Sequence, residues 1–469
     1  MHIGNARSAL YPYLLARHTG GTFILRIEDT DQKRYSPGAE QELIDGLHWL
    51  GMDYDEGPDI GGPHGPYRQT ERRETYTEYA WKLVELGHAF PCFCTPERLE
   101  KVRHEQMRNK QNPRYDGTCR SLSPDEARRR VLAGERHVIR FKMPKQGSIT
   151  TTDLVRGSIT TENSALDDSV LLKSDGLPTY NFANVIDDHL MGITHVVRGE
   201  DLIDSTHRVL AIRHALGAED RPEYAHLPLI VDAATRAKLS KRHGAVGLED
   251  FRDEGYLPEA LLNYIALLGW APPEDGDEVL DSAALIAAFD LDRVTHSAAG
   301  FDRAKLDWLN GEWMRRVSTG DLVGRIEPMA RERFGERFDG KVFPAAVALA
   351  QERSVTLRAA LDQMDFLFVD DSDFAIASES LEKLMGTERV GEILDTAIAH
   401  VESCEWNVDA INLKAPIEEA LGVKLRKAAP ALYAAVEGRH QGLPLFDSIQ
   451  LLGRDRALGR LRAARVLVG

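Results

Sequence analysis

Helix-like and strand-like segments alternate at the start of this chain, and their order restricts the folds available to it. Residues 4–18 carry leucines at helical spacing, and residues 22–29 form a short apolar run that predicts a buried strand. Further helices are expected over 36–50, capped by Ser36, and over 72–86. Such alternation is typical of a parallel sheet covered by helices, whose ligands bind beyond the carboxyl ends of the strands.

This α/β pattern is interrupted once and then returns. Residues 90–175 contain cysteines and β-like runs such as 137–141, and they are expected to form an inserted domain. A strand at 194–198 and a helix at 204–216 resume the α/β pattern. From about residue 315 onward the pattern is almost entirely helical.

The composition fits a soluble protein of several domains. The 469 residues are 43% hydrophobic and 28% charged, without an apolar run near the ~18–20 residues of a membrane span. The N-terminus does not resemble a signal peptide, so a cytoplasmic location is expected. The net charge of -16 argues against indiscriminate binding of nucleic acid, although a local basic surface is enough for one such partner.

A basic run stands out in this acidic chain: Lys238-Leu239-Ser240-Lys241-Arg242. A mobile basic loop of this kind can hold nucleotide phosphates as charge moves onto them, whereas a solvated surface turn is the commoner explanation. The segment His2-Ile3-Gly4, just before the first helix, favours the phosphate site. Its imidazole can donate to a phosphate, and its glycine allows close approach of ATP to the helix N-terminus. A disordered terminal tail is the alternative there.

Polar residues follow the expected strands. In Arg26–Asp31, Glu28 could bind an ammonium group, and a charged surface loop is an equal alternative. Arg198 ends a strand and can form a bidentate pair with a substrate carboxylate, unless it is paired with Glu200 or Asp201. The same part of the chain supplies two more polar candidates, Tyr180 and Asn184.

Three of the four cysteines lie in one short region. Cys92, Cys94 and Cys119, with Tyr115, offer thiolates and a phenolate for a tetrahedral Zn²⁺ site. Ser121 stands where a histidine would have made a cleaner set. Three reduced, buried thiols without metal are the alternative.

With these motifs, the chain resembles the bacterial glutamyl-tRNA synthetases of class I over essentially its whole length. His2–Gly4 and Lys238–Arg242 resemble the two ATP signatures usually called HIGH and KMSKS. Further similar blocks are Arg26–Asp31, Gly61–Gln69, Leu171–Asp188, Arg198–Asp201 and Leu257–Trp270.

The resemblance implies an α/β fold: a Rossmann nucleotide-binding domain, an inserted α+β acceptor-binding domain, a stem-contact segment and an all-α anticodon-binding region. The implied limits are 1–89 and 176–245 for the two catalytic halves, 90–175 for the insertion, 246–314 for the stem-contact domain and 315–469 for the anticodon-binding domain.

It also implies residue roles. The catalytic group would be His2, Gly4, Lys238, Ser240, Lys241 and Arg242. Glutamate would be held by Glu28, Tyr180, Asn184 and Arg198, with Arg198 on the side-chain carboxylate. ATP would lie near His2, Gly4, Asp201, Leu229 and Lys241. Zinc would be held by Cys92, Cys94, Tyr115 and Cys119. Candidate tRNA contacts are Arg353, Lys424, Arg426, Lys427, Arg454 and Arg456.

The implied reaction is ATP-dependent ligation of L-glutamate to tRNA(Glu) through a glutamyl-adenylate, with Mg²⁺ and one structural Zn²⁺, by a monomer. Alternatives are an enzyme that also charges tRNA(Gln), a truncated non-catalytic tRNA-binding paralogue, and a small-molecule nucleotidyltransferase. The family begins with a strand and a Pro-Ser-Pro-Thr-Gly-like loop ahead of the histidine signature, whereas this chain begins at Met1. We therefore expect a true start upstream of the recorded one, and weak folding with little activity for the chain as written.

Overall fold

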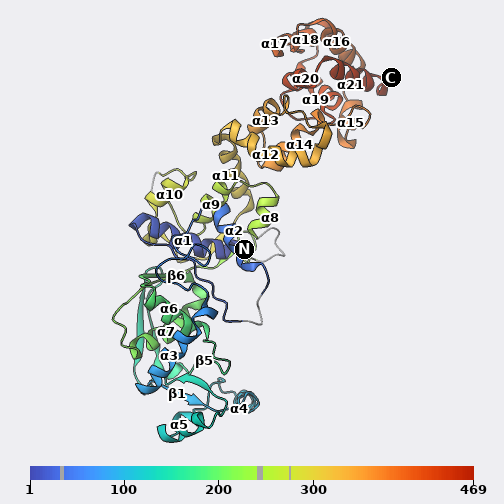
Figure 1. The fold of residues 1–469 in the computed structure, drawn as a ribbon. Coiled ribbons are helices and arrows are strands. Elements are labelled where there is room, and N and C mark those ends of the chain that lie inside the picture. The colour runs from blue at the N-terminus through green and yellow to red at the C-terminus, as the bar shows by residue number, and fades with distance from the viewer. Residues whose placement is uncertain (32–35, 240–246, 274–275) are drawn as a thin grey trace. The chain divides into compact units, whose positions relative to one another are not determined.

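The chain divides into an α/β unit and a helical unit (Figure 1). The computed structural model describes residues 1–31, 36–239, 247–273 and 276–469. One unit comprises residues 1–249 with 262–302, and the other comprises 250–261 with 303–469. Every strand within the described residues lies in the first unit. The expected combination of an α/β region with a helical C-terminal region is confirmed.

The α/β unit contains the following elements. Its helices are α1 (Ile3–Thr19), α2 (Ala39–Trp49), α3 (Arg73–Glu85), α4 (Pro96–Arg108), α5 (Pro124–Leu132), α6 (Tyr180–Leu190), α7 (Ile203–Ala215) and α10 (Ser282–Ala288). Its strands are β1 (Ala89–Cys92), β2 (Val138–Phe141), β3 (Ser148–Asp153), β4 (Gly157–Glu162), β5 (Val170–Leu172), β6 (His195–Gly199), β7 (Glu223–Leu227), β8 (Ile230–Asp232) and β9 (Ala299–Phe301). Two helices lie in sequence at the borders of the units: α8 (Leu248–Asp253) and α9 (Pro258–Ala266).

The helical unit continues the chain to its end. Its helices are α11 (Arg303–Arg316), α12 (Thr319–Phe334), α13 (Phe343–Gln351), α14 (Leu357–Met364), α15 (Ser378–Met385), α16 (Val390–Ser403), α17 (Val408–Ile411), α18 (Lys414–Leu421), α19 (Leu425–Glu437), α20 (Leu445–Leu452) and α21 (Arg454–Leu467). None of the described helices is long and apolar enough to cross a membrane.

The sheet that carries most of the candidate site has the strand order β4-β3-β7-β6. Strands β6 and β7 run parallel, and their register places Arg198 beside His226. Strand β3 joins the other side of β7 through a parallel pair between Asp153 and Tyr224. Residues 148–162, expected to belong to the insertion, thus form β3 and β4 of this sheet.

Helix α7 packs against β3 of this sheet and α1 against β6, while α6 lies between α7 and α3, and both α3 and α6 contact the neighbouring sheet β1-β2-β5 (Figure 1). The apolar faces of α3, α6 and α7 form one core that includes Tyr76, Phe182, Ile186 and Ile212, all 0% exposed. Residues 182–188 of α6 are all buried, so the helix is packed on every side and its rotation is fixed. The polar positions of α6 are therefore held in a set orientation near the ends of the strands.

The expected buried strand over residues 22–29 is wrong. The segment makes only isolated parallel bridges, from Ile24 to Glu56 and from Ile27 to Arg68. Its partners lie in a loop, so no continuous ladder forms, and Ile24 and Ile27 are only half-buried. The expected cap at Ser36 is also wrong, because α2 begins after Gly38 in the left-handed region at φ 85°. The other expected helices and strands are present within a few residues of their predicted limits.

Candidate functional site

The His2 imidazole caps the first helix. Its Nδ1 accepts the Gly4 N–H at 3.0 Å, and its backbone carbonyl accepts the N–H groups of Asn5 and Ala6. An acceptor at Nδ1 leaves the proton of a neutral imidazole on Nε2. A Cβ at position 4 would lie 3.3 Å from Nδ1, so glycine gives the ring its room. The structure thus places His2 at an ordered helix N-terminus, not in a disordered tail.

Three candidate glutamate ligands converge on one place. Tyr180 begins α6, Arg198 lies near the end of β6, and Glu28 follows the extended segment after α1. Burial raises the pKa of the Tyr180 phenol and the Glu28 carboxylate adds to this rise, while the Arg198 guanidinium, within hydrogen-bonding reach, opposes it. Groups that influence one another in this way lie close together. The site therefore brings together a phenol, the Arg198 guanidinium and the Glu28 carboxylate, which also forms an ion pair with Arg26 at 3.5 Å.

The Arg198 side chain is held by uncharged acceptors. Its Nε donates to His226 Nε2 at 3.2 Å, and its Nη2 donates to Thr206 Oγ1 at 2.7 Å and to the Leu202 carbonyl at 3.4 Å. The side chain is half-buried. These bonds use Nε and Nη2, and the Tyr180 hydroxyl also lies within hydrogen-bonding reach of the guanidinium.

The alternative that Arg198 is paired with Glu200 or Asp201 is wrong. Glu200 is engaged elsewhere: it forms an ion pair with Arg156 and accepts the Leu229 N–H at 2.9 Å. Within the part of the chain that the structure describes, no carboxylate forms an ion pair with Arg198. Its positive charge is therefore available to a bound carboxylate.

A buried network lies behind Asn184. Its Oδ1 accepts from Gln69 Nε2 at 3.1 Å, and the same Nε2 lies 2.9 Å from Asp187 Oδ2. Asp187, 0% exposed, also accepts from Arg72 Nε at 2.7 Å and from the Tyr76 hydroxyl at 2.8 and 3.0 Å. These partners satisfy the carboxylate, so it serves to anchor α6 and orient Asn184.

The candidate ATP residues occupy three neighbouring turns of the α/β unit. Asp201 is exposed just after β6, and a Cβ at Gly199 would meet its Oδ1 at 2.5 Å. Leu229 is 37% exposed, and its N–H is bound by Glu200. Lys238 is exposed and bridges to β8. The remaining basic-loop candidates lie outside the described residues: Ser240, Lys241 and Arg242.

The three cysteines of the insertion come together as the sequence predicts. The Sγ atoms of Cys92, Cys94 and Cys119 lie within 4.8 Å of one another, and the last two are 3.6 Å apart. The Tyr115 hydroxyl lies 3.4 Å from Cys92 Sγ and 3.8 Å from Cys94 Sγ. Tetrahedral Zn²⁺ with bonds of about 2.3 Å spaces its sulfur ligands by about 3.8 Å, so the cluster fits this ion.

The candidate tRNA residues divide into two groups. Lys424, Arg426 and Lys427 line a groove of about 1020 Å³ that also receives Lys383 and Arg389. Arg353 is exposed, with Nη1 donating to the Gly442 carbonyl at 2.8 Å.

Like Arg353, Arg454 and Arg456 bind backbone carbonyls of their own chain, each through two guanidinium nitrogens. Arg454 donates to the carbonyls of Glu402 and Cys404, and Arg456 donates to those of Leu367 and Val369. These bonds favour a structural role for both arginines.

Sequence reasoning missed Asp153, His226 and Gln69. Asp153 and His226 are lone polar residues on separate strands, and only the register of β3, β7 and β6 brings them to Arg198. Gln69 ends the block Gly61–Gln69, in which the resemblance implies no role for this residue. The signal that could have found His226 is its place in a buried strand, where a polar side chain needs a partner.

Known protein families and relatives match this chain along almost its whole length. The family "tRNA synthetases class I (E and Q), catalytic domain" matches residues 1–308, and "Anticodon binding domain" matches residues 321–465. A glutamate--tRNA ligase of Acidothermus cellulolyticus is 42% identical over 99% of this chain and 93% of its own length. One of Stutzerimonas stutzeri is 40% identical over 100% of this chain and 93% of its own.

Solved structures give the same answer. The crystal structure of a glutamate tRNA ligase from Elizabethkingia meningosepticum, in complex with its amino acid, matches with a TM-score of 0.90 and 32% identity, over 100% of this chain and 97% of that one. The glutamate-tRNA synthetase of Elizabethkingia anophelis matches with a TM-score of 0.87 and 33% identity, over 99% and 97%. Sequence and fold agree, and the chain belongs to the glutamate–tRNA ligases of the class I aminoacyl-tRNA synthetase family.

Proposed function

We propose that this chain ligates L-glutamate to tRNA(Glu) with cleavage of ATP to AMP and pyrophosphate, through a glutamyl-adenylate, in protein biosynthesis. The observation that carries the proposal is the convergence of Glu28, Tyr180 and Arg198 on one site in a chain of this family. A carboxylate for the ammonium group and an arginine for the side-chain carboxylate match the two charged ends of glutamate. Because Arg198 has no acidic partner among the described residues, it favours an anionic side chain.

The first chemical step is attack of the glutamate α-carboxylate on the α-phosphate of ATP, with loss of pyrophosphate. No protein nucleophile is required, so the chain acts by positioning and by stabilising charge. His2 would donate from Nε2 to a phosphate, because its Nδ1 is occupied by Gly4. Lys238, with Ser240, Lys241 and Arg242 of the same loop, would meet the departing phosphates, while Asp201 and Leu229 would border the nucleoside. ATP would arrive as its Mg²⁺ complex, and the ion would neutralise part of the phosphate charge.

In the second step a terminal ribose hydroxyl of the tRNA takes the glutamyl group from the adenylate. We propose that the residues after β1 face the acceptor end and that the C-terminal helices read the anticodon. The groove of Lys424, Arg426 and Lys427 supplies positive charge in an otherwise acidic chain, which suits binding to phosphates.

We also propose one structural Zn²⁺ on Cys92, Cys94, Cys119 and Tyr115, which would tie β1 to the segment before α5. Purified protein should contain about one equivalent of zinc, and Cys92→Ser should lose the metal and melt at a lower temperature. Cys404→Ser, at the end of α16 and outside the cluster, serves as the control. Metal-free protein that is as stable as the metal-loaded form would remove the zinc proposal.

The function is tested by aminoacylation with ATP, Mg²⁺ and [¹⁴C]glutamate, using tRNA(Glu) and tRNA(Gln) in separate reactions. Charging of tRNA(Glu) alone supports a discriminating ligase, and charging of both supports the non-discriminating alternative. Failure to charge either tRNA, in protein that is folded and monodisperse, would contradict the proposal and favour a non-catalytic tRNA-binding protein.

A further inference from the structure

A row of three polar side chains crosses the sheet of the α/β unit. Asp153 at the end of β3, His226 on β7 and Arg198 on β6 occupy adjacent strands, and Arg198 and His226 are register partners. Asp153 is 2% exposed and His226 is 0% exposed. Buried polar groups of this kind persist only where each is satisfied, so the row has a defined hydrogen-bond pattern.

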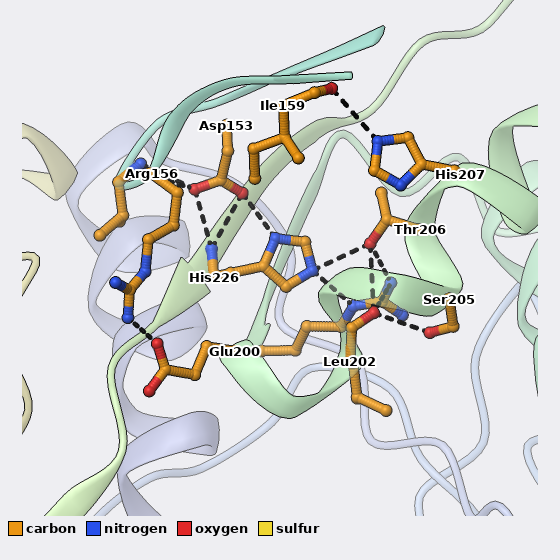
Figure 2. Close-up of polar contacts among 11 residues, drawn as sticks. Asp153, Arg156, Ile159, Glu200, Leu202, Ser205, Thr206, His207 and His226 are labelled. Atoms are coloured by element: carbon orange, nitrogen blue, oxygen red, sulfur yellow. Dashed lines mark hydrogen bonds and ion pairs between the residues drawn. The ribbon is translucent and has the colours of Figure 1, made fainter. Parts of the chain in front are cut away.

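Asp153 fixes the orientation of the imidazole. Its Oδ2 lies 2.6 Å from His226 Nδ1 and 3.1 Å from the His226 N–H, and its Oδ1 accepts the N–H groups of Val155 and Arg156 (Figure 2). Burial raises the pKa of Asp153. Hydrogen bonds from the His226 side chain and from the backbone N–H groups of Arg156 and His226 lower this pKa by more than burial raises it, so the net shift is downward. An ionised Asp153 accepts the proton on Nδ1, which leaves Nε2 as an acceptor.

Two donors then meet at Nε2. Arg198 Nε lies 3.2 Å from it and the Thr206 hydroxyl 3.0 Å from it, while Thr206 Oγ1 accepts from Arg198 Nη2 at 2.7 Å. Figure 2 shows the link from Asp153 through His226 to Thr206 at the start of α7. The imidazole separates the carboxylate from the guanidinium, so Arg198 is held in place without forming an ion pair.

We propose that Asp153, His226 and Thr206 form a positioning relay that aims Arg198 at the side-chain carboxylate of glutamate and preserves its charge for that carboxylate. The inference rests on the proposed function and deepens it, because it states how glutamate is selected over glutamine. A direct carboxylate partner in place of His226 would neutralise Arg198 and weaken its preference for an anionic side chain. An acceptor without charge fixes the geometry and leaves the attraction intact.

Two substitutions at one position separate this role from a purely structural one. In His226→Gln the amide oxygen can reach the place of Nε2 and accept from Arg198. The bond to Asp153 is lost, but an amide oxygen is always an acceptor and does not need Asp153 to set a tautomer. In His226→Asn the amide can donate to Asp153, but nothing reaches Arg198. Both variants bury a neutral amide at the same site, so their costs in stability are comparable.

The experiment measures KM for glutamate, KM for ATP and kcat in tRNA(Glu) charging, with glutamate affinity from equilibrium dialysis and melting temperature, for the wild type and the variants. We expect His226→Asn and Thr206→Val to raise KM for glutamate about tenfold or more, the effect of losing a hydrogen bond to a charged group. KM for ATP should change by less than about twofold, and His226→Gln should recover most of the glutamate affinity. Competition by L-glutamine should become relatively stronger in His226→Asn.

Equal effects of His226→Gln and His226→Asn on glutamate affinity would overturn the relay, and so would parallel rises in both KM values. A wild-type enzyme that charges no tRNA would contradict the proposed function instead, and the dialysis of glutamate would still decide whether the relay governs its binding.

Discussion

The Nε2 atom of Gln69 lies 2.9 Å from Oδ2 of Asp187, a wholly buried carboxylate 118 positions further along the chain. This bond joins the turn before α3 to the middle of α6. The same Nε2 atom lies 3.1 Å from Oδ1 of Asn184, a residue expected to bind the substrate glutamate. The orientation of Asn184 therefore depends on Asp187.

We predict that Asp187→Ala lowers the free energy of unfolding by about 3–5 kcal/mol, because it leaves the buried guanidinium of Arg72 without its carboxylate. Urea denaturation followed by circular dichroism measures this loss. Glu78→Ala, exposed on α3, is the matched control and should change stability by less than about 0.5 kcal/mol. A loss no larger than that of the control would show that the network contributes little.

Glu437 should make the stability of the helical unit depend on pH. Burial raises the pKa of this carboxyl from 4.5 to about 7, although Ser448, Arg439 and the Leu443 N–H oppose the rise. Between pH 4.5 and 7 the Glu437 carboxyl is protonated in the folded chain and ionised in the unfolded chain. The protonated carboxyl therefore contributes its full share to the free energy of unfolding below about pH 4.5, and this share declines as pH rises through 7. The expected loss is about 3 kcal/mol.

Glu437→Gln should remove this dependence. The test plots the difference in melting temperature between wild type and variant from pH 4 to 8, and the variant should gain relative to the wild type as pH rises. Glu382→Gln, exposed on α15, should run parallel to the wild type. A Glu437→Gln curve that also runs parallel would contradict the raised pKa.

Much of the fold could be predicted from the sequence, since apolar spacing located helices of the α/β unit and the strand β6 and indicated that residues from about 315 onward are helical. Pairing could not be predicted so well. Residues 22–29 have the composition of a strand, but their partners Glu56 and Arg68 lie in loops that no periodicity reveals.

The candidate site divides in the same way. Arg198 is predictable because it ends a strand, whereas its partner His226 carries no local motif and is defined only by register. Likewise, nothing local to Glu200 shows that Arg156, 44 positions earlier, takes its carboxylate away from Arg198. The spacing of residues along the chain does not predict which single residues, far apart in the sequence, will pair in the fold.

The basic groove offers a prediction about tRNA. Lys424→Ala combined with Lys427→Ala should raise KM for tRNA severalfold and reduce the salt dependence of binding by about one unit of slope for each phosphate that is no longer neutralised. Filter binding at several salt concentrations measures both. Lys341→Ala combined with Lys414→Ala, both exposed and outside the groove, is the charge-matched control. Arg454→Ala should instead lower stability, because its guanidinium binds the carbonyls at the end of α16.

Gly4→Ala separates helix stability from catalysis. Alanine favours a helix over glycine by about 1 kcal/mol, and this gain offsets the weakened His2 cap, so the variant should melt close to the wild type. Its Cβ, however, would lie 3.3 Å from His2 Nδ1 and push the imidazole from its place. If Nε2 of that ring stabilises a phosphate in the transition state, kcat should fall about tenfold or more with KM for glutamate little changed.

Gly324→Ala is the control for Gly4→Ala, because position 324 lies inside α12 and an added Cβ there would meet open space. It should gain stability from the helical preference of alanine and keep full kcat. Undiminished kcat in Gly4→Ala, with the imidazole shown by crystallography to have moved, would remove His2 from the catalytic group and leave it only the role of a helix cap.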